Sequence, residues 1–191
     1  MSILISSGYC VTLALMILLL PLGWIIPALI AAFVHELCHY TAILLCTGQT
    51  TGFGVYSFAA RIELPPMGKS KELICALAGP LGGGCLWLLS PLFPRLAICA
   101  VLQSAYNLLP IYPLDGGRAL RCTLEMMLPP AAAALAAAFI QWAVLGMMAV
   151  LAMYATFVLH GGLMPVFVVL VLLFRTKDRK MPCKPAPFAV Q

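Results

Sequence analysis

From Ala131 to Phe174 the chain holds no Asp, Glu, Lys or Arg over 44 residues. One helix of that length would be about 66 Å long at 1.5 Å per residue. About 20 apolar residues are enough to cross the ~30 Å hydrocarbon core of a bilayer. We therefore expect two membrane-spanning helices here, with a tight turn either near 152–157 or at Gly161–Gly162.

The composition extends this expectation to the whole chain. Hydrophobic residues make up 63% of the 191 positions and charged residues 9%, whereas about a quarter of an average soluble domain is charged. Eleven basic and six acidic side chains cannot cover the exterior of a water-soluble globule of this size. This excludes an ordinary cytosolic enzyme, a disordered chain and a nucleic-acid-binding module. An integral membrane protein in contact with the lipid bilayer, without a nucleic-acid partner, is predicted.

The positions of charges and prolines predict an all-α polytopic fold with about six transmembrane helices. No ionisable side chain precedes His35, and Pro21 and Gly23 divide that apolar region into two spans. A short membrane-associated β-like hairpin is expected at 52–64, where aromatic and β-branched residues precede Pro65–Pro66. The expected spans within one transmembrane domain at 1–174 are about 3–20, 24–46, 73–94, 96–128 (broken at 110–114), 131–152 and 155–174. A short basic tail follows at 175–191.

The basic residues predict the orientation of these spans. In a chain with six spans, ten of the eleven basic residues fall on one side of the membrane, and only Arg95 falls on the other. Lys and Arg are enriched in cytoplasmic loops, so both termini are expected to be cytoplasmic. The ten residues are Arg61, Lys69, Lys71, Arg118, Arg121, Arg175, Lys177, Arg179, Lys180 and Lys184.

The second expected span carries three ionisable side chains, His35, Glu36 and His39. Such groups inside a span are costly and are usually functional. Histidines at i and i+4 lie on one helix face, so both imidazoles can bind one metal ion, and Glu36 is placed to act as a general base toward water. The alternative is a pair of histidines that bond neighbouring helices beside a protonated Glu36, which leaves the metal-ligand spacing unexplained.

A third ligand is needed, because catalytic zinc usually has three protein ligands and one open position. His160 is the one remaining histidine, and the six-span order puts it toward the non-cytoplasmic side, so it is a poor candidate. Asp115 ends the uncharged stretch 96–114 and is the better one. Asp115 could also serve as the N-cap of a helix over about 116–128. The two roles are compatible, since a carboxylate has two oxygens.

Two motifs resemble the site-2 protease family of intramembrane zinc metalloproteases. The first is His35-Glu-Leu-Cys-His39, and the second is Asn107-Leu-Leu-Pro-Ile-Tyr-Pro-Leu-Asp115-Gly, which follows the family pattern Asn-x-x-Pro-x-x-Pro-Leu-Asp-Gly. Ala78-Gly79-Pro80 also resembles a family feature. The resemblance covers roughly residues 24–128. The size and six-span plan resemble the small bacterial branch that includes a sporulation protease acting on a sigma-factor precursor.

The resemblance implies one Zn²⁺ per chain, held by His35, His39 and Asp115, with Glu36 as the base that activates water. It implies that Asn107 donates to the substrate backbone or to the developing oxyanion, although a hydrogen bond between helices is an equal alternative. The hairpin would present a strand edge to an unwound substrate. The implied activity is cleavage of a transmembrane or membrane-associated protein in a bacterial cell membrane.

Two other functions remain open from the sequence. A metal-binding transporter using the same residues as a relay would carry polar groups along several spans, whereas here they converge on two. A catalytically inactive protease-like interaction protein would be expected to have lost Glu36 or a ligand, and neither is lost. A zinc metalloendopeptidase is therefore the leading prediction.

Overall fold

The computed structural model describes residues 4–5, 21–48, 53–56, 59–62, 67–160 and 162–177, and in this part the chain is mostly helical. The predicted first span at 3–20 lies outside the described residues except for Leu4–Ile5. The helices are α2 (Leu22–Thr47), α3 (Lys69–Cys85), the 3-10 helix η1 (Leu86–Leu89), α4 (Pro94–Asn107), α5 (Asp115–Met127), α6 (Pro130–Phe157) and α7 (Met164–Lys177).

Three helices in the described part are long and apolar enough to cross a membrane: Leu22–Thr47, Lys69–Leu89 and Pro130–Phe157. They overlap the spans expected at 24–46, 73–94 and 131–152. Their outer surfaces leave large apolar side chains exposed, among them Leu45 on α2 and Phe139 on α6, which suits contact with lipid. The chain is therefore an integral membrane protein, while the total of six spans stays a prediction.

The turn between α6 and α7 occupies the second of its two expected positions. Helix α6 continues to Phe157, so a turn at 152–157 and a span ending at 152 are wrong. Residues 152–157 include no glycine or proline that would end a helix. Gly162 instead has a φ of 72°, a left-handed conformation that favours glycine. The Thr156 hydroxyl donates to the Gly162 carbonyl oxygen at 3.0 Å and closes the turn.

The segment expected as one broken span at 96–128 forms two separate short helices. Helix α4 has 14 residues and α5 has 13, and each is shorter than a bilayer-spanning helix. The backbone of the loop 108–114 lies directly against the start of α5. A Cβ at Gly116 would collide with the Leu108 carbonyl, and one at Gly117 would collide with the backbone of Ile111. Only glycine allows this approach, which fixes the loop to the helix that it precedes.

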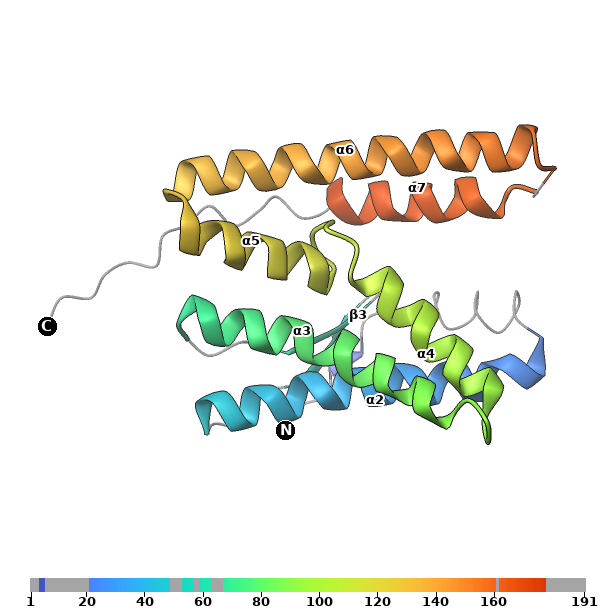
Figure 1. Cartoon of the computed structure of the whole chain (residues 1–191), viewed down its shortest axis with the longest axis horizontal. Coiled ribbons are helices and arrows are strands. Elements are labelled where there is room, and N and C mark those ends of the chain that lie inside the picture. Colours follow the sequence, from blue (N-terminus) through green and yellow to red (C-terminus); the bar gives the residue numbers. More distant parts are fainter. Residues whose placement is uncertain are drawn as a thin grey trace, which may run out of the picture.

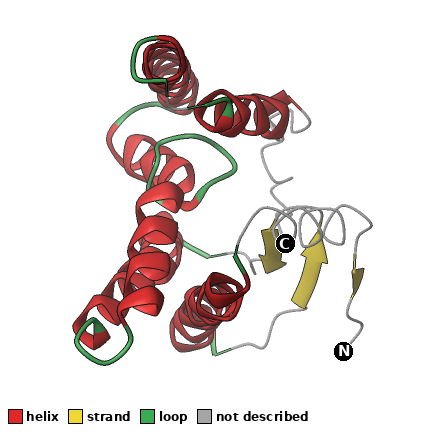
Figure 2. Ribbon diagram, turned by 90° about the vertical axis from the view of Figure 1, so that its right-hand side faces the viewer, coloured by secondary structure: helices red, strands yellow, loops and turns green. Residues whose placement is uncertain are grey.

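Three strands form a small sheet with the order β1 (Leu4–Ile5), β2 (Phe53–Tyr56), β3 (Ala59–Ile62). β1 is parallel to β2, and β2 is antiparallel to β3, with Phe53 opposite Ile62. Figure 2 shows the strands to one side of the helices. β2 and β3 fall in the segment where the sequence predicts a hairpin, but residues 57–58 between them lie outside the described part. The complete hairpin and its place at the membrane stay predictions.

The helices pack as two connected groups (Figure 1). Helix α3 contacts α2, α4 and α5, while α6 contacts α5 and runs beside α7. Between the groups, Ile111 and Leu114 of the loop pack with Leu145 of α6 and Leu172 of α7 in one buried cluster. The loop that carries the Pro-Leu-Asp segment is thus held by packing on both sides, and this fixes where α5 begins.

Candidate metal centre

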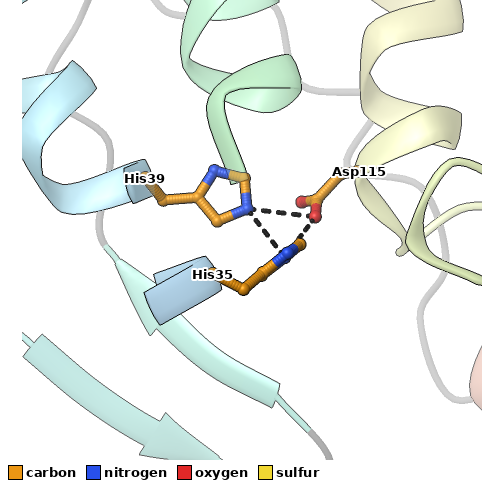
Figure 3. A group of neighbouring side chains, drawn as sticks. All are labelled: His35, His39 and Asp115. Carbon is orange, nitrogen blue, oxygen red and sulfur yellow. Dashed lines mark hydrogen bonds and ion pairs between the residues drawn. The ribbon is translucent and has the colours of Figure 1, made fainter. Parts of the chain in front are cut away.

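Three side chains from two distant segments converge on one point (Figure 3). His35 and His39 come from α2, and Asp115 is the first residue of α5. Asp115 Oδ2 lies 3.0 Å from His35 Nε2 and 3.0 Å from His39 Nε2, and the two Nε2 atoms are 3.2 Å apart. Among the described residues, this is the one group of three His, Cys, Asp or Glu ligand atoms within 4.8 Å of one another.

The centre is buried because the buried face of α2 carries both histidines. That face comprises Ala31, His35, His39, Ala42 and Ile43, which follow helical spacing. His35 is 2% exposed and His39 7%, and the Asp115 side chain is 13% exposed. Polar groups at this depth must be paired or must bind a metal. The i, i+4 spacing therefore places both imidazoles inside the protein and not toward lipid.

The three ligand atoms fit a tetrahedral zinc ion. Zn–N and Zn–O bonds of about 2.0–2.1 Å at tetrahedral angles separate neighbouring ligand atoms by about 3.3 Å. The observed separations of 3.0 to 3.2 Å come close to this value. Two imidazoles and one carboxylate are also a ligand set that suits zinc. The donor set and its spacing thus match a catalytic site with three protein ligands.

A hydrogen bond to the backbone of α3 orients one of the histidines. His39 Nδ1 lies 2.7 Å from the Cys75 carbonyl oxygen, to which it donates. The proton therefore sits on Nδ1, and Nε2 presents its lone pair to the centre. Gly79 makes room for this ring, because a Cβ at that position would overlap the imidazole. This gives a physical reason for the glycine in Ala78-Gly79-Pro80.

Glu36 lies beside the centre and is not one of the converging ligands. It follows His35 on α2, is half-buried, and interacts electrostatically with both histidines, Asp115 and Arg118. Arg118 and Arg121 lie inside α5, because the helix begins at Asp115 and continues through them. Arg118 is thus a cationic neighbour of the centre.

Asp115 does not serve as a helix cap. Helix α5 begins at Asp115 with Leu114 in the N-cap position, and no side-chain capping bond is formed. The alternative role of Asp115 as the N-cap of a helix over about 116–128 is therefore not observed, because the helix already begins at Asp115 itself. A carboxylate in the first turn also suits the helix dipole.

Asn107 and His160 stand apart from the three converging side chains. Asn107 ends α4, and its Nδ2 donates to the Gln103 carbonyl oxygen of the same helix at 3.1 Å. This bond lies within one helix. No described contact of Asn107 therefore links two helices, as the alternative role would require. His160 is exposed in the turn after α6, with a φ of 52°. This agrees with the expectation that His160 is a poor candidate for the third ligand.

Sequence reasoning missed Gln141, which supports the loop before Asp115. Gln141 is buried on α6, and its Oε1 accepts a hydrogen bond from the Tyr112 backbone N–H at 3.0 Å. The available signal was an amide side chain inside the uncharged run 131–174, where an unpaired polar group would be costly. Its partner could not be read from the sequence, because it lies 29 residues away.

No family model and no curated protein matches the chain. Among solved structures, it is similar to the site-2 protease from Methanocaldococcus jannaschii, with a TM-score of 0.66 and 19% sequence identity. The match covers 93% of this chain and 89% of that one. The chain therefore has the fold of a site-2 protease, which bears out the resemblance seen in its two motifs.

Proposed function

We propose that this chain is an intramembrane zinc metalloendopeptidase of the site-2 protease family. It hydrolyses a peptide bond in or near a transmembrane segment of a membrane-bound protein. The observation that carries the proposal is the convergence of His35, His39 and Asp115 on one buried point, with Glu36 beside them. The fold likeness to a site-2 protease supports the same reading.

The proposed roles follow from the side chains. His35 Nε2, His39 Nε2 and Asp115 Oδ2 would hold one zinc ion, which supplies a Lewis acid that polarises the scissile carbonyl. The Glu36 carboxylate takes a proton from the attacking water and delivers it to the leaving amine. Asn107 would turn its side chain toward the substrate backbone, which requires release of its bond to Gln103.

The substrate is expected to be a helix that unwinds locally. A transmembrane helix engages its backbone carbonyls in internal hydrogen bonds, so a carbonyl must be freed before it can reach the centre. An extended segment could then add to the edge of the β2–β3 pair, with main-chain bonds giving affinity. Substrates with helix-destabilising residues near the cytoplasmic boundary are therefore favoured.

The orientation from the sequence belongs to the same proposal. Both termini are cytoplasmic, the chain lies in a bacterial cell membrane, and the centre opens to water on the cytoplasmic side. Helix α5 supports this choice, because it carries Asp115 together with the basic Arg118 and Arg121. Peptide hydrolysis needs water, and a basic region beside the centre matches the cytoplasmic bias of Lys and Arg.

The test compares purified wild-type protein with Glu36→Gln on candidate single-span substrates. We expect cleavage to fall by about 10²–10⁴-fold in the variant while its zinc content stays at the wild-type level. Glu72→Gln is the matched control, because Glu72 lies at the start of α3 and pairs with Lys69 at 3.2 Å. Equal cleavage by wild type and Glu36→Gln would refute Glu36 as the base.

The same preparation separates the alternatives. A wild-type protein that binds zinc and cleaves none of the substrates would favour an inactive interaction protein. Zinc uptake into sealed vesicles, dependent on His35 and His39, would favour a transporter.

A further inference from the structure

The two histidines of the centre differ on the side that faces away from it. His39 donates its Nδ1–H to the Cys75 carbonyl oxygen. His35 Nδ1 is buried and has no hydrogen-bond partner in the protein. A histidine that binds a metal through Nε2 must carry its proton on Nδ1, and such a ring normally donates that proton to a carbonyl, a carboxylate or a water. His35 therefore needs an acceptor.

One other buried side-chain atom in the described part of the chain has no partner: the hydroxyl oxygen of Ser104. Ser104 is 6% exposed and continues the buried face of α4 after Ala97 and Ala100. Helix α4 packs against both α2 and α3. An unpaired hydroxyl at this depth carries a free-energy cost that a hydrogen bond would remove.

Gly83 of α3 brings the two unpaired atoms together. A Cβ built at Gly83 would lie 2.9 Å from Ser104 Oγ and 3.6 Å from His35 Nδ1. Both atoms therefore border the same side of one glycine, at the junction of α2, α3 and α4. A side chain at position 83 would contact both atoms, and the glycine leaves none there.

We propose that Ser104 is a positioning residue for the metal centre and that its hydroxyl oxygen accepts a hydrogen bond from the Nδ1–H of His35. The hydroxyl reaches the ring after rotation about the Cα–Cβ bond of Ser104 or through one water molecule, which would satisfy both buried atoms. In either case the bond fixes the tautomer in which Nε2 faces Asp115 and His39. The inference rests on the proposed zinc site and adds the support that His35 otherwise lacks.

The test measures zinc affinity of the full-length, metal-free protein in detergent by competition with a chromophoric chelator. Loss of a group that orients a metal-binding histidine typically costs 10–100-fold in affinity, so we expect Ser104→Ala to bind zinc at least about tenfold more weakly. Ser104→Thr keeps the hydroxyl and is expected to stay within about threefold of wild type. Cys99→Ala, which also removes one heavy atom from α4, should bind as wild type does.

Two further readouts distinguish orientation from simple packing. Ser104→Ala leaves the buried Nδ1–H of His35 without an acceptor, so the metal-free variant should unfold at a lower temperature than wild type, whereas metal-free Ser104→Thr should not. In a His35→Ala background, Ser104→Ala should cause no additional loss of zinc affinity, because the ring that it orients is gone. A loss of equal size in both backgrounds would overturn the inference.

The remaining outcomes are also decisive. Wild-type zinc affinity in Ser104→Ala would overturn the role of Ser104 and leave the proposed protease standing. A Ser104→Thr variant as weak as Ser104→Ala would show that packing and not the hydroxyl matters, and would overturn it as well. Wild-type protein that binds no zinc would remove both the proposed function and this inference.

Discussion

His39 of α2 donates its Nδ1 proton to the backbone carbonyl oxygen of Cys75 on α3, at 2.7 Å. Because the acceptor is a backbone atom, the bond depends on how closely α3 approaches α2 and not on the side chain at position 75. One turn later along α3, Gly79 faces the imidazole ring itself. The orientation of the His39 ring is thus set by a helix contact that admits no side chain.

The first prediction concerns this contact. In Gly79→Ala the added methyl would overlap the His39 ring, so the ring must turn away or α3 must shift. We expect zinc affinity to fall at least about tenfold. This is the lower end of the loss that is typical when a group that orients a metal ligand is disturbed. Gly84→Ala, on the same helix with nothing within 4 Å of the added Cβ, should keep wild-type affinity. Equal affinities in the two variants would contradict the prediction.

The second prediction concerns the carboxylate of Asp115, the proposed third ligand. Asp115→Asn keeps the size of the side chain and removes its negative charge, so it should lower zinc affinity by more than the 10–100-fold loss typical of supporting groups. Glu125→Gln is the control, because Glu125 also lies on α5 but pairs with Lys69 and Arg121. Metal content after dialysis against defined free zinc gives the measurement. Unchanged zinc occupancy in Asp115→Asn would exclude Asp115 as a ligand.

The third prediction concerns metal addition. Zinc that binds the folded state alone raises the free energy of unfolding by about 2.7 kcal/mol at a hundred times its dissociation constant. The metal-free protein should therefore melt at a higher temperature when zinc is added, as followed by intrinsic fluorescence in detergent. Mg²⁺ should have little effect, because it prefers oxygen ligands in octahedral geometry. A zinc-induced shift that persists in His35→Ala/His39→Ala would mean that the metal binds elsewhere.

The fourth prediction concerns Gln141. In Gln141→Leu the Tyr112 N–H loses its acceptor inside the protein, and an unpaired buried donor costs about 1–3 kcal/mol. We expect a loss of stability in this range together with weaker zinc binding, since the loop 108–114 leads into Asp115. Gln141→Glu keeps an acceptor oxygen and should be milder. Denaturant titration in detergent compares the free energies of unfolding of the two variants. Equal losses in both would argue against the hydrogen bond.

The membrane helices and the shared helix face of His35 and His39 were predictable because each depends on local pattern. Helix α2 was predicted at 24–46 and runs over Leu22–Thr47, since an apolar segment of that length has few other stable forms in a bilayer. The position of the α6–α7 turn was left open, because an uncharged stretch does not reveal where it bends. The break in the segment 96–128 was predicted at 110–114, whereas α4 already ends at Asn107, because the loop between α4 and α5 packs against Leu145 and Leu172, which come later in the chain.

The sequence by itself determined that the chain belongs in a membrane and that His35 and His39 share one helix face, because charge content and helical spacing are properties of single segments. Only the tertiary structure decided that Asp115, 80 residues after His35, joins them with its Oδ2 3.0 Å from both imidazoles. It also decided that the Cys75 carbonyl orients His39 and that Ser104 and His35 border one glycine. Contacts between helices depend on which side chains are small enough to permit close approach, and that is settled only when the helices pack.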